Sequence, residues 1–271
     1  MITKFKVSPK TGHQTVLELG KVAWLGLEIL RLEPGETWQG ELEDEECALI
    51  PLSGRISANI DSGKQTQFSG VGGRVDVFSG LPWAVYAPRK SKVKITAETK
   101  VELALVKAPC DKDLPPAVVK PEDVKVVSAG MANWRRDVRL VVAPGAAISQ
   151  RLIVGETVNP SGNWSGIPPH KHDEISGKEN FLEEFYWFKV KPANGYGVQL
   201  GYKDNLEESY IINNDDVYLM QNGYHPTVAA PGTTLCYLWV LSGDDKAYNI
   251  ATDPRFDWVG SAEAVLREIQ R

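Results

Sequence analysis

The sequence is poor in the features that mark disulfide frameworks, nucleic-acid binding and membrane insertion. Its three cysteines, Cys47, Cys110 and Cys236, are widely spaced and form no C-x-x-C pair, which argues against a disulfide framework or a cysteine-based zinc site. The 30 Lys and Arg against 35 Asp and Glu give a net charge of −5, unlike most nucleic-acid binders. Apolar runs fall short of the ~20 residues that span a bilayer, and residues 1–10 contain no signal-peptide core. We therefore expect a soluble, cytoplasmic protein with no nucleic-acid or membrane partner.

What the chain does contain is typical of a globular protein built from β-strands. Hydrophobic residues make up 42% of its 271 residues and charged residues 24%. Short β-branched and aromatic runs, such as residues 75–78, 93–97 and 235–240, predict strands. The 24 Gly and 17 Pro are spread between such runs as turn residues. Helical periodicity is nearly absent, and one short C-terminal helix is predicted over residues 261–269, with Ser261 as its N-cap. The fold class is therefore all-β, a sandwich or barrel.

A polar, proline-rich stretch at residues 109–116 predicts a boundary between two β domains, over residues 1–115 and 116–271. We expect residues 124–127 to pair with one of the two. Residues 73–83 and 214–225 share a rhythm of a strand followed by a turn, which favours duplication of one unit. The first half has no histidine at the place where the second half has His225.

The histidines give the strongest functional signal. His170 and His172 form an H-x-H pair after two prolines, and His225 lies in a Gly-Tyr-His-Pro segment, whereas His13 stands alone and is expected on the surface. Side chains alternate along a strand, so an H-x-H pair directs both imidazoles to one face. A lone H-x-H pair is common on surfaces, and a lone His225 could be an ordinary loop residue. Together, three imidazoles predict a site for a divalent metal.

A carboxylate ligand is predicted at the start of the aromatic run 183–190. If Glu184 faces the same interior as Tyr186 and Phe188, it is a buried charge that needs a partner or a metal. Glu183 would then point outward or lie in the preceding loop. The reverse assignment, with Glu183 as the ligand, remains an alternative, and we favour Glu184.

These residues carry a resemblance to a known family. Residues 161–173, 182–186, 195–199 and 223–226, with residues 52–55 and 73–82 in the first half, resemble the 5-deoxy-glucuronate isomerase family of bacterial inositol catabolism. This family is related to 4-deoxy-L-threo-5-hexosulose-uronate ketol-isomerase, and both belong to the cupin superfamily. The resemblance implies a bicupin, with two tandem β-barrels of the double-stranded β-helix type. It places the metal ligands at His170, His172, Glu184 and His225 in the second barrel and leaves the first barrel without metal.

The chain departs from the family pattern at three positions. Asp215 stands where the family usually has Gly, and Gln221 stands where it usually has Pro. Trp239 stands where the deoxyglucuronate branch commonly has Asn, and there it is more similar to the ketol-isomerase branch. These changes leave the four ligands intact and bear on the identity of the sugar acid.

The resemblance implies an aldose–ketose isomerase of a deoxy-sugar acid, converting 5-deoxy-glucuronate to 5-dehydro-2-deoxy-gluconate. A divalent metal can stabilise the enediolate that forms. We favour Zn and then Mn, while Fe, Co and Ni also suit the ligand set. The catalytic candidates are Glu184, Tyr186, Gln199 and Tyr224. Arg136 is the first candidate for binding the substrate carboxylate. Lys171 is the second, although strand alternation places it opposite the histidines, where a surface or lobe contact is expected.

Several alternatives share these residue types. The related ketol-isomerase would act on 4-deoxy-5-hexosulose-uronate, and a cupin dioxygenase would use the same ligands to hold Fe(II). A non-catalytic sugar-acid-binding cupin would bind without turnover, and a storage bicupin is disfavoured because all four candidate ligands are kept. Exposed strand edges also allow self-association, so we expect a homodimer or a higher homo-oligomer.

Overall fold

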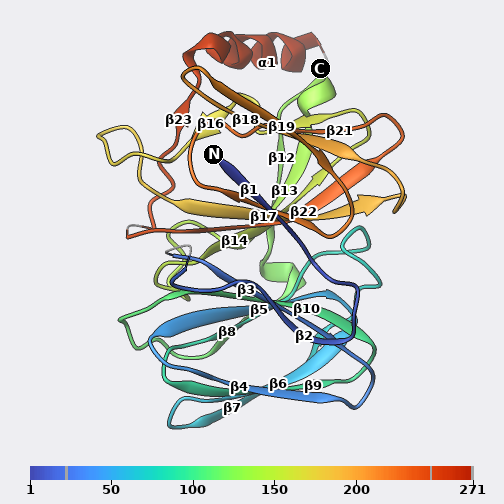
Figure 1. The fold of residues 1–271 in the computed structure, drawn as a ribbon, viewed down its shortest axis with the longest axis vertical. Coiled ribbons are helices and arrows are strands. Elements are labelled where there is room, and N and C mark those ends of the chain that lie inside the picture. Colours follow the sequence, from blue (N-terminus) through green and yellow to red (C-terminus); the bar gives the residue numbers. More distant parts are fainter. Residues whose placement is uncertain (22–23, 245, 270–271) are drawn as a thin grey trace.

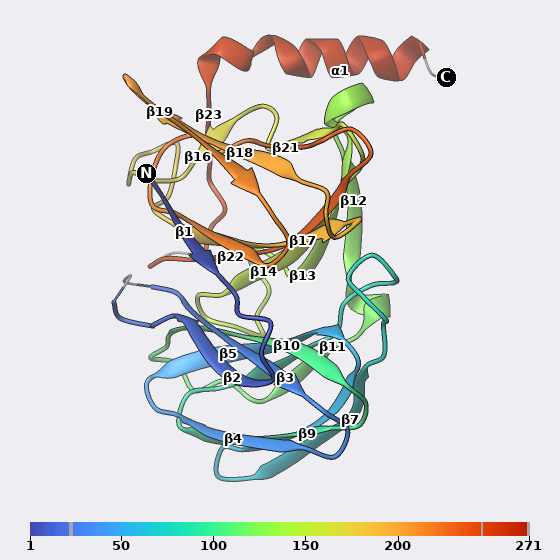
Figure 2. The same cartoon turned by 45° about the vertical axis from the view of Figure 1, so that its right-hand side comes forward.

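A computed structural model describes residues 1–21, 24–244 and 246–269, and nearly all its regular structure is β-strand (Figure 1). Two lobes are stacked along the long axis, with the first half of the chain below and the second half above. Each lobe has a larger sheet facing a four-stranded sheet (Figures 1 and 2). The two larger sheets face each other across the lobe boundary. The prediction of an all-β fold with a short C-terminal helix is confirmed.

In the first lobe, the six-stranded sheet has the order β11-β8-β5-β10-β3-β2 and the four-stranded sheet has the order β4-β9-β6-β7. Every neighbouring pair is antiparallel. The strands are β2 (Gly12–Leu17), β3 (Gly26–Leu32), β4 (Thr37–Leu42), β5 (Glu45–Ser53), β6 (Arg55–Asp61), β7 (Gln65–Gly72), β8 (Ala84–Ala87), β9 (Ser91–Ala97), β10 (Val101–Pro109) and β11 (Ala117–Val119).

In the second lobe, a seven-stranded sheet has the order β1-β20-β17-β22-β14-β13-β12 and a four-stranded sheet has the order β15-β21-β18-β19, with the small pair β16-β23 beside them. The strands are β1 (Ile2–Lys6), β12 (Lys125–Ala129), β13 (Arg136–Val142), β14 (Ile153–Asn159), β15 (Trp164–Ser165), β16 (His170–Lys171), β17 (Glu183–Lys191), β18 (Gly197–Lys203), β19 (Leu206–Ile212), β20 (Asp216–Met220), β21 (Thr227–Ala229), β22 (Thr234–Ser242) and β23 (Ala251–Thr252).

Two short segments cross between the lobes. β1 pairs with β20 in the sheet of the second lobe, and β11 pairs with β8 in the sheet of the first. After a 3₁₀ turn, η1 (Pro121–Asp123), β12 pairs with β13, so residues 125–127 join the second lobe. The predicted boundary at residue 115 therefore lies in the connector that precedes β11. One apolar core cluster includes Leu27 and Ile50 of the first lobe together with Phe185 and Trp187 of the second.

Two of the three predicted strands are confirmed, at residues 93–97 in β9 and 235–240 in β22. The strand predicted over residues 75–78 is wrong, because these residues form bends and turns. Val75 is 83% exposed. Asp76 Oδ1 accepts a hydrogen bond from the backbone N–H of Phe78 at 2.9 Å, a local contact that favours a turn over a strand.

The C-terminal helix begins earlier than predicted. α1 (Trp258–Ile269) starts three residues before Ser261, so Ser261 lies inside the helix and is not its N-cap. A 3₁₀ turn, η3 (Pro254–Phe256), precedes it, with the Asp253 carboxylate accepting from Arg255 N–H. Because Asp257 is already helical, the turn runs on into α1. The helix lies across the far end of the second lobe (Figure 2). No helix of the described residues is long and apolar enough to cross a membrane.

Candidate metal centre

Four side chains from separate segments meet inside the second lobe. His170 belongs to β16 and His172 follows it, while Glu184 is the second residue of β17 and His225 precedes β21. One ligand atom from each lies within 4.8 Å of the others. His172, Glu184 and His225 are each 3% exposed. Alternation places both rings of the H-x-H pair on one side, so the local rule behind the sequence prediction accounts for the geometry.

Backbone carbonyls fix the orientation of two of the imidazoles. His172 Nδ1 lies 2.6 Å from the carbonyl oxygen of Leu182, and His225 Nδ1 lies 2.9 Å from that of Gly223. If each Nδ1–H donates to its carbonyl, the lone pair on each Nε2 is free for a metal. Both Nε2 atoms lie 3.1 Å from Oε2 of Glu184.

The buried donor atoms fit a divalent cation. His225 Nε2 is fully buried and has no hydrogen-bond partner of adequate geometry, despite its closeness to Glu184. A buried nitrogen lone pair directed at a carboxylate oxygen is unfavourable unless a proton or a cation lies between them. Three imidazoles and one carboxylate are a common ligand set for divalent transition metals. We conclude that this cluster can hold such an ion.

Burial and mutual contacts set the charges in the cluster. Burial and, to a smaller extent, the two neighbouring histidines together lower the pKa of His170 to about 3. Burial alone would raise the pKa of Glu184, but the contact with His172 and the nearby His225 imidazole outweigh it and lower this pKa to about 2. The centre therefore combines a neutral His170 with an ionised Glu184, and a cation can bind without displacing a proton from either.

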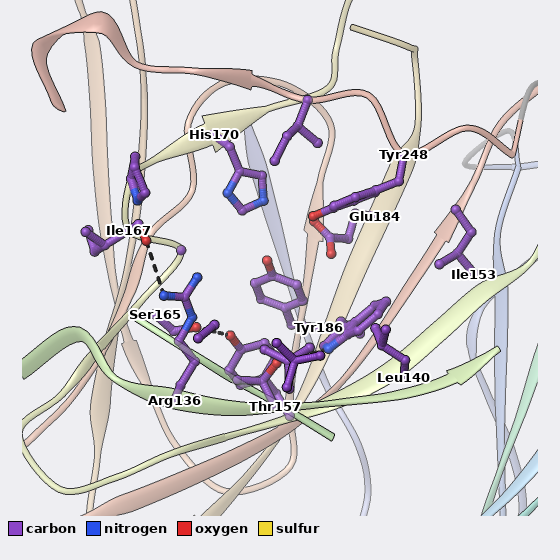
Figure 3. Close-up of a pocket in the computed structure, with 18 of the residues that line it drawn as sticks. Arg136, Leu140, Ile153, Thr157, Ser165, Ile167, His170, Glu184, Tyr186 and Tyr248 are labelled. Carbon is purple, nitrogen blue, oxygen red and sulfur yellow. Dashed lines mark hydrogen bonds between the residues drawn. The ribbon is translucent and has the colours of Figure 1, made fainter. Parts of the chain in front are cut away.

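A cavity of about 410 Å³ opens beside the centre (Figure 3). His170 and Glu184 lie on one side and Arg136 lies on the other. Arg136 Nη1 donates to the carbonyl oxygens of Ile167 at 3.2 Å and Trp134 at 3.3 Å. The remaining polar lining residues are Thr157, Ser165, Tyr186, Tyr237, Trp239, Tyr248 and Thr252, and apolar lining comes from Val127, Ala129, Val138, Leu140, Pro144, Ile153 and Ile250.

The predicted site residues are divided between the cavity and its surroundings. Tyr186 lines the cavity two residues beyond Glu184, and Arg136 lines it from β13. Gln199 lies outside the cavity lining and is fully buried, with Nε2 donating to the carbonyl oxygen of His225 at 2.9 Å. Tyr224 stacks on Tyr202 with ring centres 5.1 Å apart and is not part of the lining.

Lys171 and Glu183 also lie away from the cavity. Lys171 Nζ is 2.8 Å from Asp173 and 2.9 Å from Glu179, on the strand face opposite the histidines. Glu183 points away from the centre, but the expectation that it lies outward or in a loop is wrong, because it begins β17 and is 7% exposed. It accepts a hydrogen bond from the backbone N–H of Trp24 at 3.1 Å, and burial raises its pKa to about 7.

Sequence reasoning missed several polar residues of the cavity wall, including Tyr237, and it noted Trp239 only as a departure from the family pattern. Tyr237 and Trp239 occur in the predicted strand 235–240 and alternate with the residues that face the other lobe. Their cross-strand partners on β17 are Phe188 and Tyr186. The available signal was this period of two, which places Tyr237, Trp239 and Tyr186 on one face.

The fold and the ligand set define a two-lobed cupin, and the one candidate metal centre found among its described residues lies in the second lobe. The chain belongs to the KduI/IolB family, whose profile matches residues 5–259. The family resemblance seen in the sequence is thereby confirmed.

Curated relatives and solved structures agree with this assignment. A protein of Geobacillus kaustophilus named 5-deoxy-glucuronate isomerase is 35% identical over 92% of this chain and 91% of its own length. A protein of Bacillus subtilis with the same name is 29% identical over 92% and 93%. An IolB-like protein of Salmonella typhimurium superposes with a TM-score of 0.89, 27% identity and coverage of 96% and 98%. Oxalate decarboxylase of Bacillus subtilis, at 12% identity and a TM-score of 0.66 over 92% and 78%, shares the fold.

Proposed function

We propose that this protein isomerises 5-deoxy-glucuronate to 5-dehydro-2-deoxy-gluconate with the help of a divalent metal. The prediction of a sugar-acid isomerase is confirmed by the relatives, which carry the name 5-deoxy-glucuronate isomerase over nine-tenths of the chain. The observation that carries the proposal is the four-ligand centre at the wall of a cavity that also contains Arg136. A sugar acid has a carbonyl group that can bind at the metal centre and a carboxylate that can bind Arg136.

The metal would be held by His170, His172, Glu184 and His225. A bound divalent ion supplies Lewis-acid stabilisation of the negative charge that develops on the substrate oxygens. The three imidazoles favour zinc as the resident ion, with manganese second, on the softness of the ligands.

Arg136 binds the substrate carboxylate in this proposal. Within the part of the chain that the structure describes, its guanidinium has no carboxylate partner, and both of its hydrogen bonds go from Nη1 to backbone carbonyls. These bonds fix the plane of the group, and its position across the cavity from His170 separates the carboxylate from the reacting end (Figure 3). A fixed guanidinium can then bind a carboxylate through two parallel hydrogen bonds.

Glu184 and Tyr186 are proposed to act in the proton transfer between the reacting carbons. Glu184 is the only carboxylate among the described residues that line the cavity, so it is the candidate base for the proton that moves between neighbouring carbons. Tyr186 lies two residues beyond Glu184 on the same face of β17, and in this proposal its hydroxyl orients the carboxylate. Gln199 supports the site from behind through the His225 carbonyl.

A second substrate is favoured by one residue. Trp239 lines the cavity, and its type at this position is more similar to the ketol-isomerase branch of the family. The candidate substrate of that reaction is 4-deoxy-5-hexosulose-uronate.

One experiment tests metal, reaction and substrate together. The metal content of the purified protein is measured by mass spectrometry, and each of the two sugar acids is followed by NMR with and without oxygen. We expect bound zinc, oxygen-independent turnover of 5-deoxy-glucuronate, and loss of turnover after chelation that returns with added metal. Turnover that requires oxygen would indicate a dioxygenase, and binding without turnover would indicate a non-catalytic cupin.

Two further expectations concern the protein in the cell. Cys47, Cys110 and Cys236 are all buried and unpaired, which supports a reducing, cytoplasmic location. The outer strand β12 leaves one sheet edge open, and Val126 on it is 48% exposed, which supports pairing between two copies. Molar mass in solution tests that homodimer.

A further inference from the structure

A row of polar side chains crosses the cavity wall. Trp239 Nε1 donates to Thr157 Oγ1 at 3.0 Å, and Thr157 on β14 is the cross-strand partner of Tyr237 on β22. Tyr237 Oη lies 2.6 Å from Ser165 Oγ. The four residues come from three strands, and all four line the cavity. Tyr237 is 4% exposed, so its hydroxyl is shielded from bulk water.

One arrangement of protons along this row leaves the phenolic proton of Tyr237 for a ligand. The indole N–H of Trp239 can only donate, so Thr157 accepts from it, and the Thr157 proton can then be directed to its cross-strand partner Tyr237. Tyr237 Oη can accept a second hydrogen bond from Ser165. In this arrangement both acceptor positions of Tyr237 are used, and its phenolic proton is free to bind an acceptor in the cavity.

Arg136 places positive charge beside this phenol. Burial raises the pKa of Tyr237, although Ser165, Arg136 and Thr157 act against it. Tyr237 therefore stays protonated at neutral pH and acts as a donor. Figure 3 shows Arg136, Ser165 and Thr157 on the same side of the cavity, across from His170 and Glu184.

We propose that Tyr237 donates a hydrogen bond to the substrate carboxylate that Arg136 binds, so that the two residues form one anion subsite. Thr157, Ser165 and Trp239 are positioning residues that direct the phenolic proton toward this subsite. The inference rests on the proposed function for the identity of the anion. It also gives Trp239 a role, because its N–H occupies one acceptor position of Thr157 and so favours donation from Thr157 to Tyr237.

Tyr186 and Tyr248 are less suited to this role. Tyr186 faces Glu184 of the metal centre, and burial together with the negative charge of Glu184 raises the pKa of this phenol. Tyr248 is 38% exposed, and the described part of its segment is coil. Tyr237 alone combines a buried hydroxyl, two hydroxyl neighbours and the nearby guanidinium.

The test compares Tyr237→Phe with Tyr218→Phe, a matched control. Tyr218 is another buried phenol of the second lobe, but it donates to the Ile211 carbonyl at 2.8 Å and is not part of the cavity lining. We expect Tyr237→Phe to raise KM for the sugar acid about 10–100-fold, the cost of one hydrogen bond to a charged group. The expected change in kcat is less than about threefold, and Tyr218→Phe should leave both constants unchanged.

Two ligands locate the effect. An analogue with the carboxylate reduced to an alcohol should bind the wild type and Tyr237→Phe with equal affinity. The second ligand is the sugar acid with its carbonyl reduced to an alcohol, and its Kd is measured by calorimetric titration. For Tyr237→Phe this Kd should rise, relative to the wild type, by the same factor as KM. This second titration needs no turnover, so a wild-type protein without isomerase activity would refute the proposed function and still report on the subsite. Equal losses for the two ligands, or a fall in kcat at constant KM, would overturn the inference.

Thr157 tests the positioning step and also serves if Tyr237→Phe does not fold. Thr157→Val removes the hydroxyl at nearly constant volume and should raise KM for the acid, whereas Thr157→Ser should restore it. In the double variant Thr157→Val with Tyr237→Phe, KM for the acid should be close to that of Tyr237→Phe alone, because Thr157 acts through the phenol. Additive effects, or a serine variant as weak as the valine variant, would contradict the row as described.

Discussion

At the scale of single residues, the metal centre depends on imidazoles whose second nitrogen is already engaged. His225 Nδ1 contacts the Gly223 carbonyl, so the ring cannot turn away without losing that bond. We expect His225→Ala or His170→Ala to abolish both metal retention and turnover, measured by metal analysis and the isomerase assay. His13→Ala is the control, because His13 pairs with Glu28 in the first lobe. Full activity of either ligand variant after chelation would rule out this centre.

Arg136 makes a separate prediction at the other side of the cavity. Arg136→Ala removes the guanidinium that faces the metal ligands across the cavity (Figure 3). We expect KM for the acid substrate to rise by about 10–100-fold, the cost of lost hydrogen bonds to a charged group. For a neutral analogue the rise should be much smaller. An equal rise for both compounds, read from steady-state kinetics, would remove Arg136 from carboxylate binding.

The residues that sequence reasoning found are those governed by local rules. His170 and His172 share a strand face, and Glu184 belongs to an aromatic strand where a buried charge needs a partner. Alternation also placed Lys171 correctly on the opposite face, where it binds Asp173. Tyr237 was missed because its partner Ser165 is 72 residues away in the sequence. The contact between Tyr237 and Ser165 depends on how β22 packs against β15, and the sequence of one strand does not show its neighbour in the other sheet.

At the scale of strands, the fit between β14 and β22 depends on one glycine. Gly155 lies opposite Trp239, and a Cβ there would come 2.6 Å from the Arg139 carbonyl oxygen and closer still to the indole. We expect Gly155→Ala to lower the free energy of unfolding by about 1–3 kcal/mol through overpacking. It should also raise KM, because the displaced indole would leave Thr157.

Urea denaturation and steady-state kinetics measure these two effects. Gly177→Ala is the matched control, because nothing lies within 4 Å of a Cβ built at Gly177. A Gly155 variant with the stability and KM of the wild type would show that Trp239 can shift without consequence.

The strand predictions were correct where a run of strand-forming residues was not interrupted by turn-forming side chains. Residues 93–97 and 235–240 are long enough for β-branched and aromatic residues to indicate β9 and β22. Residues 75–78 carry the same residue types but follow paired glycines, and Asp76 bonds to the backbone within two residues. The early start of α1 also depends on a local side-chain contact. Asp253 accepts a hydrogen bond from Arg255 N–H and starts a 3₁₀ turn that runs on into the helix, several residues before the helical periodicity of the sequence begins.

At the scale of the whole molecule, the two lobes share a fold and differ in what fills them. The interior of the first lobe is packed with apolar side chains such as Leu49, Ile56 and Ile95. The corresponding interior of the second lobe contains the metal ligands and the cavity. Among residues 1–21, 24–244 and 246–269, the side chains placed to hold a metal lie in the second lobe, and the first lobe packs against it through a shared apolar core. The sequence indicated this difference through the distribution of histidine, but not the crossing of β1 or β11.

The two lobes are also joined by a buried ion pair. The Arg74 guanidinium forms a bidentate contact with Glu156 of β14 and donates to the Pro51 carbonyl at 3.0 Å. The side chains are 4% and 1% exposed, and Arg139 lies 3.2 Å from the same carboxylate. Removal of one partner leaves the other charge buried, which typically costs about 3–5 kcal/mol.

We therefore expect Arg74→Ala to lower the free energy of unfolding by about 3–5 kcal/mol in urea denaturation. Arg55→Ala is the control, because Arg55 pairs with Glu98 at the surface, where such pairs contribute about 0–1 kcal/mol. The triple variant Arg74→Met, Glu156→Leu and Arg139→Met removes all three charges of this cluster and should recover most of the loss. If Arg74→Ala cost no more than Arg55→Ala, the lobes would be held together by the apolar interface alone.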